Sequence, residues 1–197
     1  MAGVLLAFEG LDQSGKQTQA GLLHDRLTAA GHRIRLLSFP DYETAIGREL
    51  QRALQGGRHY GPDVMQLLYV ANRYERKPDL LAGLGAGEIL ICDRYVASSV
   101  AYGEAQGLDA GWLLDIQRFL PPPDLTILLD IDPATAVRRK AVGRDRYERD
   151  LDLLARVRQS YHRLAAGNGW VHLDGARDRE AIAAEIFTAV ARRLGRP

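Results

Sequence analysis

The feature that most constrains this chain is a glycine-rich loop set between an apolar segment and an amphipathic one. Residues 4–8 are all apolar, and Gly10 and Gly15-Lys16 follow, with four residues between the two glycines. The apolar run predicts a buried strand, and the apolar spacing over 16–30 predicts a helix. A strand, a loop with these glycines and lysine, and a helix in this order are the context of a phosphate-binding P-loop. The alternative is a glycine-rich turn that binds no ligand.

The rest of the chain alternates short apolar runs with longer amphipathic ones. Further strands are predicted at 34–39, 88–92, 125–131 and 170–173, and helices from Pro62, from Pro133 and along the stripe from Ile182 to Leu194. Because parallel strands need long crossovers, usually helices, this alternation predicts a parallel sheet covered on both faces. We therefore predict a three-layer α/β fold with a five-stranded parallel sheet flanked by helices, in a single domain over residues 1–197.

Polar residues follow four of the predicted strands. They are Glu9-Gly10, Phe39-Pro40, Asp93-Arg94 and Asp130 to Asp132. In an open parallel sheet, ligands bind beyond the carboxyl ends of the strands. We therefore expect these four segments to lie near one another at a ligand site.

The composition excludes several other classes of protein. The formal net charge is +1, so no overall basic field favours nucleic acid or an anionic membrane. Cys92 is the only cysteine, which excludes an intramolecular disulfide and a cysteine-based zinc site. No apolar run approaches the roughly 20 residues that span a bilayer, and no cationic stretch precedes the first strand. We expect a cytoplasmic protein without nucleic-acid or membrane partners.

The P-loop departs from its usual pattern at one position. After the glycine and lysine, Ser or Thr is expected as a Mg²⁺ ligand, but Gln17 stands there and Thr18 follows. Either the amide oxygen of Gln17 binds the metal, or water replaces it. Lys16 is expected to bridge the β- and γ-phosphates of ATP. The residues expected to bind the ATP phosphates are Gly10, Leu11, Asp12, Gln13, Ser14, Gly15, Lys16, Gln17 and Thr18.

Binding ATP does not by itself separate a kinase from a GTPase or a mechanical ATPase. An Asn-Lys-x-Asp motif for reading guanine is absent, and a mechanical ATPase usually has a longer chain. A second set of polar and aromatic residues, suited to a small acceptor molecule, favours a kinase.

Several segments together resemble the thymidylate kinase family of P-loop kinases, which phosphorylate dTMP. In order, they are Phe8 through Gln19, Phe39-Pro40, Leu68 to Glu75, Asp93 to Tyr95 with Ser98, Ser99, Ala101 and Tyr102, Leu120 to Leu125, and Gly143 to Glu148. They cover nearly the whole chain, and their joint occurrence is much more specific than any one segment. The resemblance implies a P-loop kinase fold, transfer of a phosphoryl group from ATP with Mg²⁺ to dTMP, and a homodimer.

The resemblance also implies roles for residues at the acceptor. Asp12 accepts a hydrogen bond from the 3′-hydroxyl; alternatively, it only caps the loop. Tyr69 stacks on thymine, although an aromatic residue on an amphipathic helix usually belongs to the core. Arg73 donates to a base carbonyl and approaches the phosphate, or is a solvated helix arginine.

The pair Asp93-Arg94 is expected at the reacting phosphates. Arg94 can hold the acceptor phosphate with two hydrogen bonds, and Asp93 can orient either Arg94 or the water shell of Mg²⁺. A buried structural salt bridge is the alternative for this pair. The other residues expected at the acceptor are Phe39, Pro40, Tyr42, Ser98, Ser99 and Tyr102.

The stretch from Arg138 to Arg146 is dense in cations, and charge alone would make it a solvated face. The resemblance instead implies a lid over ATP around 138–150. Some family members carry a catalytic arginine in the phosphate loop, where this chain has Gln13, and others supply it from the lid. We therefore expect Arg144 or Arg146 to be catalytic, together with Lys16, Asp93 and Arg94, and Arg139 to lie against adenine.

Two alternatives stay open at this point. One is a kinase of another nucleotide, or of a nucleoside, on the same fold. The other is a catalytically silent nucleotide-binding module, for which Gln17 is the only hint.

Overall fold

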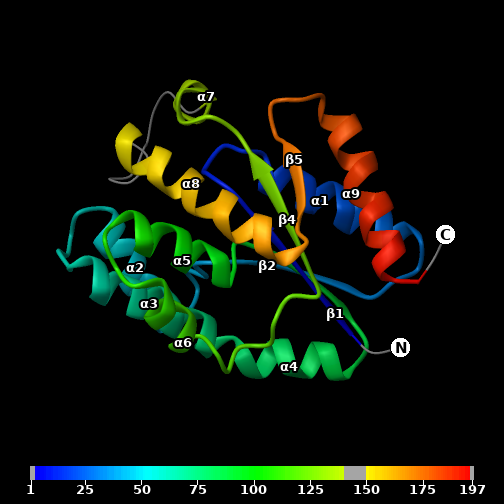
Figure 1. Ribbon diagram of the computed structural model, residues 1–197. Coiled ribbons are helices and arrows are strands. Elements are labelled where there is room, and N and C mark those ends of the chain that lie inside the picture. The colour runs from blue at the N-terminus through cyan, green and yellow to red at the C-terminus, as the bar shows by residue number, and fades with distance from the viewer. Residues whose placement is uncertain (1–2, 140–149, 196–197) are drawn as a thin grey trace.

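The computed structural model of the chain describes residues 3–139 and 150–195, and in it five parallel strands form one sheet with helices on both faces (Figure 1). The strands are β1 (Val4–Glu9), β2 (Ile34–Ser38), β3 (Ile89–Asp93), β4 (Leu125–Asp130) and β5 (Val171–Asp174). The helices are α1 (Lys16–Ala29), α2 (Ala45–Leu54), α3 (Pro62–Glu75), α4 (Lys77–Gly85), α5 (Val96–Ala105), α6 (Ala110–Asp115), α7 (Pro133–Arg139), α8 (Leu151–Asn168) and α9 (Arg179–Arg193). The predicted three-layer α/β fold is confirmed.

The strand order is β2-β3-β1-β4-β5, so β1 lies in the centre of the sheet. Ala7 of β1 pairs with Cys92 on one side and with Thr126 on the other. The chain winds to one side of β1 through β2 and β3, and then crosses to the other side with β4. Ligands bind where the winding of a parallel sheet changes sides, and the glycine-rich loop that follows β1 lies there.

Each face of the sheet buries a different set of side chains. Leu6 and Phe8 of β1 belong to one apolar cluster with residues of α1 and α9, such as Leu23 and Ile186. Leu5 and Ala7, on the opposite face, pack with Leu80 of α4. A further cluster joins β4 to α5 and α8 on that second face. In Figure 1, α1 and α9 accordingly lie together on one side of the sheet, and α5 and α8 on the other.

Helices α2, α4, α5, α6 and α8 are additional to the helices predicted above. Helix α2 packs on α3 through a small cluster that contains Leu50, Ala53 and Met65. Helix α8 begins after Asp150, whose carboxylate accepts a hydrogen bond from the backbone N–H of Leu153 at 2.9 Å. An N-terminal cap of this kind stabilises the first turn of a helix. Both helices shape the site described below, so their positions matter for function.

The structure also describes the single cysteine and the lengths of the helices, on which the sequence excluded a disulfide and a membrane span. Cys92 is buried in β3, and burial raises the pKa of its thiol. A buried thiol of this kind is unreactive. Within residues 3–139 and 150–195, every helix is too short or too polar to cross a membrane.

The loop between β2 and α2 is tied to α3 by the buried side chain of Asn72. Its Oδ1 accepts from the N–H of Asp41 at 2.8 Å, and its Nδ2 donates to Thr44 Oγ1 at 2.7 Å. Arg76 adds an ion pair with Asp41, with Nε 2.6 Å from Oδ2. Gly47 lets the first turn of α2 approach this loop, because a Cβ there would lie 1.7 Å from the carbonyl oxygen of Asp41. The loop is therefore fixed from two helices.

Replacing Gly47 by alanine should destabilise the protein. The added methyl group forces the loop and α2 apart, and overpacking of this kind costs about 1–3 kcal/mol. The free energy of unfolding from urea denaturation measures the effect. Gly21→Ala in α1 is the matched control, since its Cβ meets nothing within 4 Å. That change should stabilise the protein by up to about 1 kcal/mol through helix propensity. A Gly47→Ala protein as stable as the unchanged one would contradict the packing described here.

Candidate active site

The loop between β1 and α1 adopts backbone conformations that glycine favours. Gly10 has a φ of +135° and Gly15 a φ of +97°. A Cβ on Gly10 would lie 2.3 Å from the carbonyl oxygen of Leu129 on β4, so the loop packs directly on the neighbouring strand. Gln13 also has a positive φ, +64°, at a cost of about 1 kcal/mol. A loop that turns in this way before a helix N-terminus presents backbone N–H groups to an anion.

A cleft of about 470 Å³ lies over this loop. Its lining residues are Asp12, Gln13, Gly15, Lys16, Gln17, Thr18, Ser38, Phe39, Pro40, Tyr42, Asp93, Arg94 and Arg139. We call it the phosphate cleft. Residues that follow β1, β2 and β3 meet there, as expected. Of the predicted loop residues, Leu11 and Ser14 are buried behind the cleft, and Gly10 packs against β4.

Lys16 is the buried cation of this cleft. Its side chain is nearly inaccessible to solvent, and Nζ donates to the carbonyl oxygen of Leu11 at 2.7 Å. Burial, and after it the charge of Arg94, lowers the pKa of Lys16 to about 8. An anion bound in the cleft would restore the missing charge compensation and raise this pKa again. The lysine is therefore suited to a phosphate group.

Arg94 and Asp12 form an ion pair at the junction of β1 and β3, with Arg94 Nη2 2.9 Å from Asp12 Oδ1. The guanidinium also donates to Ser98 Oγ at 3.1 Å and to the hydroxyls of Tyr161 and Tyr102 at 3.4 Å. Burial is the largest single effect and disfavours its charge, but the carboxylate of Asp12 together with Tyr102 and Tyr161 outweighs burial and raises the pKa of Arg94. Asp12 thus holds the guanidinium of Arg94 in place.

A buried carboxylate supports Arg94 from behind. Glu9 is fully buried at the end of β1, and its Oε1 accepts from the N–H of Tyr95 at 2.9 Å. Its Oε2 accepts from Ser98 Oγ at 2.6 Å and from the hydroxyl of Tyr161 at 3.0 Å. Arg94 itself has a φ of +66°. These contacts on both sides hold the strained residue in place.

Asp93 offers an oxygen to the phosphate cleft. Its Oδ1 is buried and has no hydrogen-bond partner among the described residues. Gln17 and Thr18 line the same cleft from α1. Carboxylate, amide and hydroxyl oxygens are the donors that Mg²⁺ prefers, directly or through its waters. These residues therefore fit a magnesium ion.

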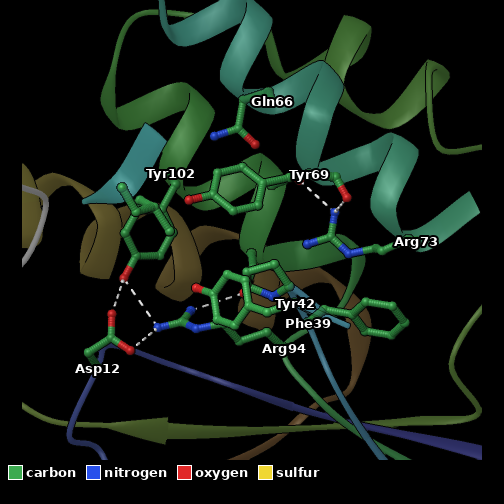
Figure 2. A pocket seen from close by; sticks show the side chains of 12 residues that line it. Asp12, Phe39, Tyr42, Gln66, Tyr69, Arg73, Arg94 and Tyr102 are labelled. Atoms are coloured by element: carbon green, nitrogen blue, oxygen red, sulfur yellow. Dashed lines mark hydrogen bonds and ion pairs between the residues drawn. The ribbon is translucent and has the colours of Figure 1, made fainter. Parts of the chain in front are cut away.

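A narrower pocket of about 110 Å³ opens beside the phosphate cleft (Figure 2). We call it the acceptor pocket. All ten residues predicted at the acceptor line it: Asp12, Phe39, Pro40, Tyr42, Tyr69, Arg73, Arg94, Ser98, Ser99 and Tyr102. Leu54 of α2 and Gln66 of α3 complete the lining. The pocket is thus built from the ends of β1, β2 and β3 and from α2, α3 and α5.

Arg73 is not a solvated helix arginine, because it is only 3% exposed. Its Nη1 donates to Ser99 Oγ at 2.8 Å and to Gln117 Oε1 at 3.2 Å. Burial lowers its pKa, and the carboxylate of Glu9 partly offsets that effect. In Figure 2 the guanidinium lies at the edge of the pocket beside Tyr69. It is therefore held in place to meet a ligand.

The cation-rich stretch is only partly described. Arg139 lines the phosphate cleft, and its Nη1 and Nη2 donate to the carbonyl oxygens of Gln13 and Gly175, both at 3.0 Å. Its expected contact with adenine stays a prediction. Arg144 and Arg146, and most of the predicted lid over 138–150, lie outside the described residues.

Asp130, at the end of β4, does not line the phosphate cleft, although the sequence predicted that it would lie there with the other three strand ends. Its two carboxylate oxygens each accept from Arg158 of α8 at 2.7 Å, and His162 lies 3.1 Å away. His172 of β5 approaches the same carboxylate at 3.7 Å. Because Arg158 already occupies both oxygens, this group forms an ion-pair network that fastens α8 to the sheet.

A family model described as thymidylate kinase matches residues 8–186 of the chain. The chain belongs to the thymidylate kinase family. It is 35% identical to the thymidylate kinase of Schizosaccharomyces pombe over 193 residues, which cover 95% of this chain and 91% of that protein. It is also 35% identical to the human thymidylate kinase over 187 residues, covering 93% of this chain and 88% of that protein.

A solved thymidylate kinase structure from Candida albicans, an enzyme described as having broad substrate specificity, has the same fold. The TM-score is 0.88 at 28% identity, and the match covers 98% of this chain and 93% of that one. Membership of the thymidylate kinase family confirms the predicted enzyme class, an ATP-dependent nucleoside monophosphate kinase. The family also supports the predicted function over the two alternatives, another kinase on this fold and a silent nucleotide-binding module.

Several residues of the site are absent from the sequence predictions. Gln66 lies three and seven residues before Tyr69 and Arg73, so the helical period alone could have found it. Glu9 was expected near the site because it follows an apolar run, but its role behind Arg94 was not predicted. Tyr161 and Gln117 carry no such signal, since they reach the site from distant parts of the chain.

The lowered pKa of Lys16 predicts that nucleotide binding takes up a proton above pH 8. In the free protein the lysine loses its proton as the pH rises through about 8, whereas bound phosphates favour the charged form. Affinity for ATP should therefore fall by up to about tenfold per pH unit between pH 8 and 9. Calorimetric titration in buffers of different ionisation enthalpy counts the protons taken up. Lys16→Arg, which stays charged, should show none, and uptake by this variant would contradict the assignment.

Proposed function

We propose that this protein transfers the γ-phosphoryl group of ATP to dTMP and so makes ADP and dTDP. The observation that carries the proposal is the wall shared by the phosphate cleft and the acceptor pocket. Both are lined by Asp12, Phe39, Pro40, Tyr42 and Arg94. A donor phosphate over the loop and an acceptor phosphate in the pocket would meet beside Arg94. Direct transfer between two bound phosphates requires such an arrangement.

The phosphate loop holds the donor in this proposal. The loop residues from Gly10 to Thr18 surround the phosphates of ATP, and Lys16 bridges the β- and γ-phosphates. The burial of Lys16 supports this role, since a desolvated ammonium gains most from a phosphate partner. Arg139 is proposed to lie against adenine, at the rim of the same cleft.

The acceptor phosphate is held by Arg94. The guanidinium is already fixed by Asp12 and Ser98 before the substrate arrives, so little order is lost when the phosphate binds. Tyr42 lines the same wall and is proposed as a second phosphate ligand. The acceptor phosphate is already an anion, so no strong general base is needed. Alignment and charge compensation supply the catalysis.

The nucleoside part of dTMP fills the rest of the acceptor pocket. We propose that Tyr69 stacks on thymine and that Arg73 donates to a base carbonyl. Asp12 accepts a hydrogen bond from the 3′-hydroxyl, which it can do while one oxygen contacts Arg94. The remaining contacts are proposed to come from Phe39, Pro40, Ser98, Ser99 and Tyr102.

A magnesium ion is proposed to bind with ATP. When bound, it neutralises charge on the transferring phosphates. The residues that would hold it are Gln17, Thr18 and Asp93, of which Asp93 has the unsatisfied buried oxygen. Since Gln13 replaces the arginine that some family members have in the loop, Arg144 or Arg146 is proposed to add the remaining positive charge.

The acceptor assignment predicts both a substrate order and the effect of changing Arg94. Among dTMP, dUMP, dCMP, dGMP and thymidine, dTMP should give the highest kcat/KM, measured by ADP release. Thymidine should fail because it offers Arg94 no phosphate. Arg94→Lys should lower kcat/KM for dTMP by about 100-fold, because one ammonium group cannot make the two parallel hydrogen bonds of a guanidinium to the phosphate. Arg192→Lys on the exposed face of α9 is the control. No preference for dTMP would contradict the proposal.

We also infer a homodimer that packs through α3, and a cytoplasmic location where both nucleotide substrates are found. Val64 and Leu67 lie one turn apart on α3 and are 38% and 46% exposed. Single exposed apolar residues are common, but neighbours on one helix face suit a helix–helix contact. This feature supports the dimer implied by the family.

Light scattering after size exclusion tests the dimer. Leu67→Glu should convert it to a monomer, because the new carboxylate would be buried without a partner. Leu81→Glu on α4 is the matched control, since Leu81 is 49% exposed and lies on another helix. A protein that is monomeric without any change, or a dimer that survives Leu67→Glu, would contradict this interface.

A further inference from the structure

Gln66 lines the acceptor pocket from α3 (Figure 2). The residue is 1% exposed, and its Oε1 is buried without a hydrogen-bond partner among the described residues. Buried amide oxygens are almost always hydrogen-bonded, because burial removes their water. The wall of the pocket thus contains an acceptor without a donor, and rotation of the amide would turn it toward a ligand.

Gln66 lies on the same face of α3 as Tyr69 and Arg73. The three residues are spaced i, i+3 and i+7, so their side chains form one row along the helix. In the proposed function, the base stacks on the middle residue, Tyr69. The long side chains on either side, Gln66 and Arg73, then both reach the polar edge of that base.

The acceptor atoms around Arg73 are already in use. Arg73 Nη1 donates to Ser99 Oγ at 2.8 Å and to Gln117 Oε1 at 3.2 Å. Ser99 therefore keeps its hydroxyl proton as a donor, which suits a base carbonyl. Gln66 Oε1 differs from both, because no donor of the described chain reaches it.

We propose that Gln66 determines base specificity, with its Oε1 accepting the hydrogen bond from N3–H of thymine. This inference rests on dTMP as the acceptor substrate. N3–H is the one donor on the thymine ring of a nucleotide, and a carbonyl stands on each side of it. Gln66 accepts from N3–H while Arg73 donates to a carbonyl, so the two side chains match the thymine edge.

The same pair of side chains rejects cytosine. Cytosine has a lone pair at N3 and an amino group in place of the 4-carbonyl. With Gln66 Oε1 turned to the base, the N3 lone pair would face an acceptor, and the amino group would face the donors of Arg73. Rotating the Gln66 amide to present Nε2 relieves the first clash but not the second. A site built to hydrogen-bond one group discriminates strongly against an analogue that lacks it. Gln66 therefore favours thymine and uracil over cytosine.

The test compares dTMP with its N3-methyl derivative, which has no N3–H. The unchanged enzyme should show a kcat/KM at least about 100-fold lower for the methylated substrate. In Gln66→Leu, kcat/KM for dTMP should fall about tenfold, mainly through KM, since one buried hydrogen bond is lost. The kcat/KM for the N3-methyl substrate should not fall, so the ratio between the two substrates should shrink by about tenfold or more, and the preference for dTMP over dCMP should shrink with it.

Controls separate this role from a general loss of structure. Gln51→Leu, on the exposed face of α2, should leave both ratios unchanged. KM for ATP should be the same in Gln66→Leu as in the unchanged enzyme. If the leucine variant does not fold, Gln66→Met carries the same comparison.

Three outcomes would overturn the inference. The first is an unchanged enzyme that uses the N3-methyl substrate within about threefold of dTMP, since no bond to N3–H then contributes. In the second, Gln66→Leu and Gln66→Met keep the full discrimination while Ser99→Ala loses it, which would assign N3–H to Ser99. The third is an unchanged enzyme inactive on dTMP, which overturns the proposed function and this inference with it. The first two leave the proposed function intact.

Discussion

The buried carboxylate of Glu9 holds the catalytic end of this protein together. It ends the central strand β1 and accepts hydrogen bonds from Tyr95 and Ser98 at the start of α5 and from Tyr161 of α8. A buried charge is tolerated only where hydrogen bonds replace its water. The N-terminus of α5 adds a favourable dipole. One side chain thus fixes a strand and two helices relative to each other.

The position of Arg94 follows from this arrangement. It lies between Asp93 and Tyr95 with a φ of +66°, a conformation that non-glycine residues rarely adopt. Tyr95 is held by Glu9, and the guanidinium is held by Asp12, Ser98 and the hydroxyl of Tyr161. Strained residues persist only where the surroundings fix them in this way, and such positions cluster at functional sites. The arginine is oriented before any phosphate binds.

Two cations of the phosphate cleft, Arg94 and Lys16, differ in how their charges are compensated. Arg94 has the carboxylate of Asp12 as its partner, whereas the ammonium of Lys16 has, within residues 3–139 and 150–195, only the carbonyl oxygen of Leu11 as a hydrogen-bond acceptor. Burial and the charge of Arg94 make the protonated lysine costly, which the lowered pKa reflects. An incoming polyanion relieves both effects. The positive charge of Lys16 costs free energy without a bound anion, so binding phosphates is favourable because it stabilises that charge.

The sequence by itself determined the P-loop, the parallel sheet and the set of ten residues that line one pocket. The loop and the sheet follow from local spacing, because apolar period and glycine position act over a few residues. The acceptor residues followed from family motifs that are contiguous in the chain. Gln66 could also have been predicted from the sequence, since it shares a helix face with Tyr69 and Arg73.

Only the tertiary structure decided which residues support that site from behind. Glu9 and Tyr161 are 152 residues apart, and Arg73 meets Gln117 across 44. Asp130 pairs with Arg158 of α8 instead of joining the phosphate cleft, because α8 packs over the end of β4. Contacts of this kind depend on how whole helices pack on the sheet. No local pattern in the chain encodes them, because their partners are brought together only when the fold is complete.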